Sequence, residues 1–202
     1  YGDHPYGHLP IGSDPALRAL PLEEVQAFHH RVFTPRKATL VIAGPMAHQE
    51  LLGVAGAAFG DWPGNGSAGR LFAEEPNGAV APPRLTVIPR SGAAQSELRI
   101  GHLSATRTTP DYPALLVMNA VLGGQFVSRI NLRLREEKGY TYGARTGFDW
   151  RRGIAPFALQ ASVHTASTAD AIRDSLAELE AIRGTRPPTG SEMTLAKASL
   201  TR

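Results

Sequence analysis

Arg135 and Tyr142 are the two side chains of this sequence whose types and spacing best suit the binding of a carbonyl oxygen or an anion. The run 134–139 predicts the last turn of a helix that ends at Gly139, and the residues after it predict an aromatic strand. Because this helix and this strand meet within a few residues, we expect the guanidinium and the phenol, both hydrogen-bond donors, to converge on one point. The alternative interpretation is an arginine that complements the helix dipole and a tyrosine that packs in the core.

A glycine pair and a serine precede this helix. Gly123 and Gly124 end a nearly all-apolar helix predicted over 114–122. Ser128 stands where its hydroxyl can cap the next helix by accepting a backbone N–H bond. Two interpretations of the glycines stay open. They either terminate a helix only, or they let a bound chain approach the backbone closely, because glycine carries no side chain.

These residues together resemble a segment of the insulinase/pitrilysin-type zinc metallopeptidases, a family that includes the mitochondrial processing peptidases. In that family the pattern L-G-G-x-x-x-S-R-L…L-R-E-x-x-G-x-x-Y lies in the half of the molecule opposite the metal. The matching positions are Leu122, Gly123, Gly124, Ser128, Arg129, Leu134, Arg135, Glu136, Gly139 and Tyr142. Ile130 departs from the pattern, because leucine is usual there, and Gln125 shortens the glycine run. Residues 1–62 resemble the end of the metal-bearing half.

The resemblance implies roles for four residues. Arg135 and Tyr142 would hydrogen-bond the carbonyls of an extended peptide substrate and support the transition state from across a closed chamber. Gly123 and Gly124 would border that chamber and contact the peptide. Peptide-bond hydrolysis itself would use Zn²⁺ held in the complementary half, so the resemblance assigns no catalytic residue to this chain.

The zinc motif of that family, H-x-x-E-H, does not occur in the sequence. The motif places two histidines one helical turn apart to hold the metal, with a glutamate as the base for metal-bound water. His4 and His8 have the same separation, but Pro5 and Gly7 between them exclude a shared helix face. We therefore expect no metal and no cofactor in this chain, and no activity of the chain alone.

Composition excludes several other classes of function. The chain has 202 residues, no cysteine and a net charge of +3 that comes from scattered basic residues. Disulfides, thiolate metal sites and a cysteine nucleophile are excluded, and no apolar run reaches the roughly 18 residues of a membrane-spanning helix. The pI of about 9.5 is a weak indication of nucleic-acid binding. The composition is that of a soluble globular protein and leaves both cytoplasm and periplasm open.

Three parts are expected along the chain. Residues 1–62 form the end of the metal-side half, 63–83 are a linker rich in proline and glycine, and 84–202 are the C-terminal inactive peptidase domain, truncated at its end. Because the pattern stops within a helix, we expect the chain to be a piece of a longer polypeptide.

The coarse secondary structure predicts an α+β fold, in which an antiparallel sheet carries helices on one face and a helix-strand-helix segment precedes it. The first part is predicted as an irregular loop, a helix, a buried strand and a helix, over 1–20, 20–33, 38–44 and 47–59. The third part is predicted to have strands over 85–88, 96–103, 140–148 and 156–163, and helices over 114–122, around Arg135, over 167–183 and from 191 onward. The side chains expected to face inward on helices are Leu51, Leu52, Val54, Ala55, Ala58, Ile172, Leu176, Leu179 and Ile182, and Glu137 is expected to pair with Arg133.

Three functional hypotheses follow. The first is a non-catalytic C-terminal part of a zinc metalloendopeptidase, which closes the substrate chamber and binds the peptide through Arg135 and Tyr142. The second is a metal-free partner or scaffold subunit of a heteromeric peptidase-like complex. The third is an RNA-binding α+β domain, which the basic pI favours, although the strand over 98–103 lacks the aromatic residues on which bases would stack.

Overall fold

The computed structural model describes residues 5–64 and 84–201, and the chain divides into two units, Tyr1–Glu74 and Glu75–Arg202. Each unit is considered by itself. The predicted linker lies outside the described residues except at its first two positions, so its boundaries stay predictions.

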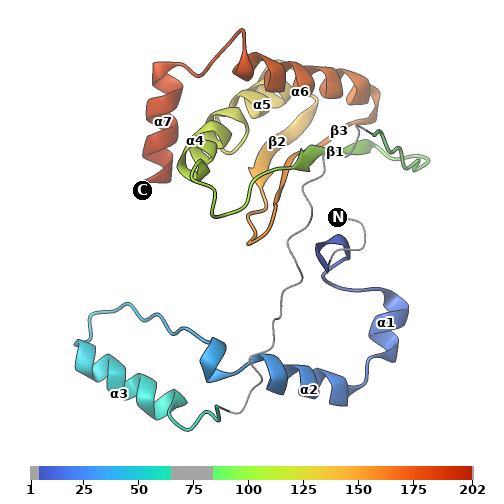
Figure 1. Ribbon diagram of the computed structural model, residues 1–202. Helices are drawn as coiled ribbons and strands as arrows, with labels where there is room; N and C mark the ends of the chain where they lie inside the picture. The colour runs from blue at the N-terminus through green and yellow to red at the C-terminus, as the bar shows by residue number, and fades with distance from the viewer. Residues whose placement is uncertain (1–4, 65–83, 202) are drawn as a thin grey trace. The chain divides into compact units, whose positions relative to one another are not determined.

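The first unit consists of helices joined by extended segments (Figure 1). Its elements are η1 (Pro5–Gly7), α1 (Asp14–Ala19), α2 (Leu22–Val32), η2 (Pro35–Lys37) and α3 (His48–Phe59). α2 begins after Pro21 with two acidic residues in its first turn, as its sequence predicts. α1 lies where an irregular loop was expected, and the Ser13 hydroxyl caps it by accepting a hydrogen bond from the Ala16 N–H at 3.3 Å.

The predicted strand over 38–44 is wrong, because these residues form no bridge to another strand within the described residues. Val41 is 84% exposed. A strand needs a neighbour for its backbone hydrogen bonds, and no described segment of this unit provides one. The inward face predicted for α3 is wrong for the same reason: the helix buries no side chain, since no described segment of the unit packs against its apolar face as a second layer.

The second unit is built on a three-stranded antiparallel sheet, which confirms the predicted α+β class. Its strands are β1 (Gln95–Leu103), β2 (Thr141–Phe148) and β3 (Pro156–His164), in the order β1-β3-β2. The register pairs Gln160 of the central strand with Arg99 on one side and with Arg145 on the other. The strand predicted over 85–88 is wrong, because that segment is exposed and forms no bridge with any described residue.

The helices of the unit are α4 (Tyr112–Leu122), α5 (Arg129–Asn131), which continues as the π-helical η3 (Leu132–Glu137), the short η4 (Thr165–Ser167), α6 (Thr168–Arg183) and α7 (Gly190–Leu200). α4, α5 and α6 cover one face of the sheet (Figure 1). The core between them contains Leu98, Leu122, Ile130, Leu134, Ala144, Phe157, Leu159, Ala161, Val163 and Ala171. α7 packs on α4 through Ala196, which meets Ala120 and Val121.

The inward face predicted for α6 is confirmed except at Leu176. Ile172, Leu179 and Ile182 pack against the core, whereas Leu176 is 48% exposed. The most deeply buried residues of the helix are Ala171, Ser175 and Glu178. The small side chains of Ala171 and Ser175 let α6 lie close to the core. Glu178 can be buried because Arg186 donates a hydrogen bond to its carboxylate and balances its charge.

Candidate functional site

The turn that follows α4 contains two glycines, and one of them is hydrogen-bonded to β2. The N–H groups of Gly123 and Gly124 both donate to the Asn119 carbonyl, at 2.9 and 2.7 Å, and the Gly123 carbonyl accepts the Thr146 N–H at 3.0 Å. A Cβ at Gly123 would lie 2.6 Å from the Thr146 nitrogen, and one at Gly124 would lie 2.6 Å from Asn119 Nδ2. Gly123 therefore does more than end a helix, since it lets the turn touch the strand, whereas Gly124 lets the turn fold back onto Asn119 of α4.

Asn131 fixes the rest of this loop, a role that sequence reasoning missed. Its Nδ2 donates to the Phe126 carbonyl at 2.7 Å, and its Oδ1 accepts the Ala144 N–H at 3.0 Å. The only sequence signal is a polar residue among apolar ones at the start of a helix. Together, Asn131 and Gly123 engage two outward N–H groups of β2, those of Ala144 and Thr146.

Arg129 anchors the other end of the loop to α7. Its guanidinium donates to both carboxylate oxygens of Glu192, at 2.6 and 2.7 Å, and to the carbonyls of Arg186 and Pro187. Hydrogen bonding from Arg129 lowers the pKa of Glu192 to about 2, and bonds from the Thr189 backbone and hydroxyl act in the same direction against burial. The Glu192 carboxylate in turn raises the pKa of Arg129.

The capping role predicted for Ser128 is wrong. Ser128 is the N-cap residue of α5, but its hydroxyl makes no capping bond and is buried without a hydrogen-bond partner. Asn131 and Arg129 hold this turn instead, so the hydroxyl is not needed to fix the start of the helix.

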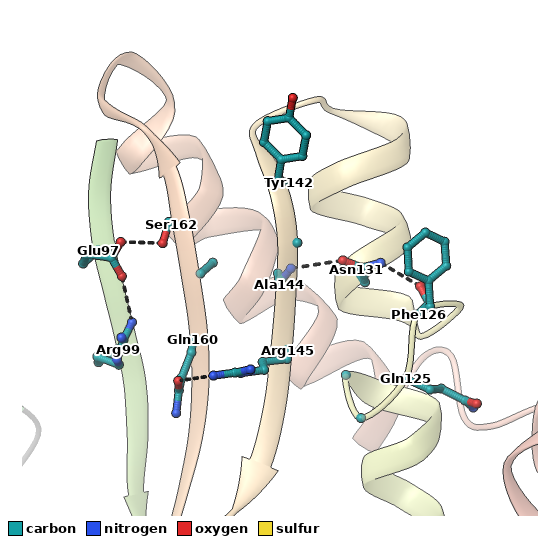
Figure 2. Close-up of a pocket in the computed structure, with 14 residues that line it drawn as sticks. Glu97, Arg99, Gln125, Phe126, Asn131, Tyr142, Ala144, Arg145, Gln160 and Ser162 are labelled. Atoms are coloured by element: carbon teal, nitrogen blue, oxygen red, sulfur yellow. Dashed lines mark hydrogen bonds and ion pairs between the residues drawn. The ribbon is translucent and has the colours of Figure 1, made fainter. Parts of the chain in front are cut away.

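An open groove of about 410 Å³ lies between the uncovered face of the sheet and this loop (Figure 2). The sheet contributes five polar side chains to it, those of Glu97, Arg99, Arg145, Gln160 and Ser162. The loop contributes the backbone of the glycine pair together with Gln125 and Phe126. The groove thus has a polar floor and one aromatic wall.

Hydrogen bonds order the polar floor. The Ser162 hydroxyl donates to Glu97, and Arg99 Nη1 donates to the same carboxylate at 3.2 Å. Both bonds lower the pKa of Glu97, the one from Ser162 more strongly. Arg145 Nη2 donates to Gln160 Oε1 at 3.3 Å. Sequence reasoning missed these five residues, because alternation along a strand marks them only as the solvent face.

Three of the four predicted site residues line the groove. Tyr142 stands at one end of it with 92% of its surface exposed, and Gly123 and Gly124 line it through their backbone (Figure 2). Arg135 does not line it. Its guanidinium carbon lies 4.4 Å from the centre of the Phe126 ring, and its Nε lies 3.5 Å from Glu136. Arg135 therefore contacts Phe126, which lines the groove, but does not line the groove itself. The convergence of Arg135 and Tyr142 on one point stays a prediction.

The described residues contain neither a metal-ligand cluster nor a membrane-spanning helix. Within 5–64 and 84–201, no three His, Cys, Asp or Glu side chains gather where they could hold a metal ion. None of the helices in these ranges is both long and apolar enough to cross a bilayer.

Comparison with known families decides the identity of the chain. Residues 19–200 match the model of the family described as the peptidase M16 inactive domain. The chain belongs to this family. The resemblance to insulinase-type zinc peptidases expected from the glycine pair and its flanking residues is thereby confirmed.

The M16 inactive domain has relatives in several bacteria. An uncharacterized zinc protease of Mycobacterium tuberculosis is 29% identical over 99% of this chain and 45% of its own length. Another, from Mycobacterium leprae, is 27% identical over 99% of this chain and 44% of its own length. The chain thus spans less than half the length of these relatives.

Solved structures share the fold of this inactive domain. A peptidase M16 inactive domain from Pseudomonas fluorescens superposes with a TM-score of 0.84 at 24% identity, and covers 99% of this chain and 47% of its own. A protease from Helicobacter pylori superposes with a TM-score of 0.86 at 20% identity, over 98% of this chain and 48% of its own.

Proposed function

We propose that this inactive domain binds an extended peptide in the groove and closes a substrate chamber opposite a zinc-bearing half that cleaves it. The observation that supports the proposal is the gathering of Tyr142, the backbone of Gly123 and Gly124, and the Arg135–Phe126 stack around one open groove. The relatives are named zinc proteases, and the chain matches less than half of their length. The remaining, larger part of each relative is long enough to contain a metal-bearing half.

Each site residue has a role suited to its surroundings. The Tyr142 hydroxyl is free to donate to a peptide carbonyl, since the side chain is almost fully exposed. Arg135 donates to a second carbonyl from the Phe126 side, where the ring limits the directions open to its guanidinium. The glycine backbone lets the peptide approach closely. Closure over the peptide excludes water, and each of these bonds then becomes stronger than in the open domain.

The zinc chemistry belongs to the complementary half in this proposal. A bound Zn²⁺ supplies an activated water and polarises the scissile carbonyl. Arg135 and Tyr142 hold the peptide in register with that metal and donate to the oxygen on which negative charge develops.

Two measurements test the proposal. The first is binding of a fluorescein-labelled, unstructured peptide to the full chain by anisotropy. The second is turnover of the same peptide after the chain is mixed with the complementary, zinc-bearing part of the Mycobacterium tuberculosis relative. We expect saturable binding by the chain alone and turnover only in the mixture.

Variants of the two donors sharpen this test. Arg135→Ala and Tyr142→Phe should each weaken binding by about twofold to tenfold, as expected for the loss of one hydrogen bond, and should lower turnover further, by about a hundredfold, if they bear developing charge. Arg173→Ala is the matched control, because Arg173 is an exposed arginine of α6 that pairs with Asp170 and does not line the groove. Unchanged binding and turnover in both donor variants would contradict the proposed roles.

A further inference from the structure

The polar floor of the groove carries a positive charge that no carboxylate in the described part of the chain balances. Arg99, Gln160 and Arg145 form one row across the three strands, because the register pairs Gln160 with each arginine. Strand alternation puts this row on the face opposite the buried Leu159 and Ala161, and Figure 2 shows the side chains in front of the sheet with the helices behind.

The two arginines differ in their partners. Arg99 donates a hydrogen bond to the Glu97 carboxylate, which also accepts one from Ser162. The positive charge of Arg99 is therefore balanced by Glu97, two residues earlier on the same strand. Arg145 has one hydrogen bond in the described part of the chain, to the neutral side chain of Gln160, and pairs with no carboxylate there. The groove is therefore neutral on the β1 side and positive on the β2 side, the strand that also carries Tyr142.

We propose that Arg145 forms a subsite for a carboxylate side chain of the bound peptide, with Gln160 as the residue that positions its guanidinium. This inference rests on the proposed peptide binding, and it adds the substrate preference of the same groove. A guanidinium presents paired N–H donors that match the two oxygens of a carboxylate. The Gln160 bond holds one of its nitrogens beside the central strand, and Arg145 itself lines the groove.

Charge complementarity favours an acidic peptide over a nucleic acid as the occupant. Nucleic-acid sites collect several cations along a phosphate backbone. This groove has one unbalanced guanidinium and also contains the Glu97 carboxylate, which repels successive phosphates. A single acidic side chain on an otherwise neutral strand fits that charge distribution, and a basic side chain at the same position would be repelled by Arg145.

The test compares two labelled peptides that are identical except for one central residue, Asp in one and Asn in the other. Anisotropy with the full chain at low salt should show the Asp peptide binding about threefold more tightly, the size expected of a solvent-accessible ion pair. Raising the ionic strength should shrink this gap. In Arg145→Gln the ratio of the two dissociation constants should fall to about one, and Arg145→Lys should restore part of it. Arg173→Gln, on α6, should keep the full ratio.

The outcomes separate the subsite from the groove. Equal binding of both peptides by the native chain, or a gap that survives in Arg145→Gln, would overturn the Arg145 subsite while leaving peptide binding intact. Binding of neither peptide would refute the proposed function and this subsite with it. Tighter binding of a single-stranded oligonucleotide than of the Asp peptide would also overturn the inference, because it would identify the positive charge as part of a phosphate site.

Discussion

Protonation of Glu192 should measurably destabilise the second unit, because this carboxylate holds Arg129 at the end of the groove-lining loop. Its pKa falls from the ordinary value of 4.5 to about 2 in the folded chain. Each tenfold change in proton affinity is worth about 1.4 kcal/mol, so the interaction would contribute about 3 kcal/mol if the group were fully buried. The side chain is 29% exposed, and solvent screening reduces our expectation to about 2 kcal/mol.

The direction of the pH dependence follows from the lowered pKa. A carboxylate whose pKa is lower in the folded state stabilises the fold above its unfolded value of 4.5, and this contribution is lost as the pH falls from 4.5 to about 2. Glu192→Gln removes the titrating group. The free energy of unfolding of the variant should therefore be lower by about 2 kcal/mol near neutral pH, and the difference between the two proteins should shrink below pH 4.5 and disappear below pH 2.

Urea unfolding followed by tryptophan fluorescence can measure this difference across the pH range. Trp150 reports on the second unit, because its ring stacks on Phe148 at 4.6 Å. The measurement should be made in a Trp62→Phe background, since Trp62 lies in the first unit. Glu180→Gln is the control, because Glu180 is exposed and should give a curve parallel to that of the native chain. A Glu192→Gln curve that is also parallel between pH 4.5 and 2 would refute the reasoning.

Three further substitutions test the packing of the loop and the core by the same unfolding assay. Gly123→Ala should destabilise the second unit by about 1–3 kcal/mol, because its Cβ would lie 2.6 Å from the Thr146 nitrogen. Gly147→Ala is the control on β2: a Cβ there would have no atom within 4 Å, so the free energy of unfolding should not change. Gly139→Ala should lose about 1 kcal/mol because φ is +63° there, and Gly139→Asn should lose less. Leu134→Ala should lose about 2–5 kcal/mol, since the side chain is fully buried; a loss below 1 kcal/mol would contradict its assignment to the core.

Local sequence patterns predicted those elements whose partners lie in the described part of the second unit. The strand predicted over 156–163 is present as β3, and Phe157, Leu159, Ala161 and Val163 on one of its faces are all buried. Gly139, the residue at which a helix was predicted to end, has a φ of +63°, which is the left-handed conformation typical of such an end. Glu137 accepts a bond from Arg133 at 2.7 Å, as its helical spacing predicts.

Predictions failed where the outcome depends on a distant partner. Residues 38–44 and 85–88 have the composition of strands, but without a neighbouring strand their backbone forms no bridge. The Asn131 side chain links the Phe126 carbonyl to the Ala144 N–H. No local sequence pattern predicts that these two backbone groups lie close enough to bind the same side-chain amide. The Arg145–Gln160 pair likewise depends on the register between β2 and β3.

The hydrogen bonds that Asn131 and Gly123 make to β2 also bear on how the protein behaves at high concentration. Outer strands with unpaired N–H groups invite another copy to add its own strand, and such additions can grow into fibrils or exchange segments between molecules. At Ala144 and Thr146 these donors are already occupied from within the chain. These two N–H groups are thus not available to a neighbour's backbone, even though Tyr142 and Arg145 on the same strand remain open to solvent.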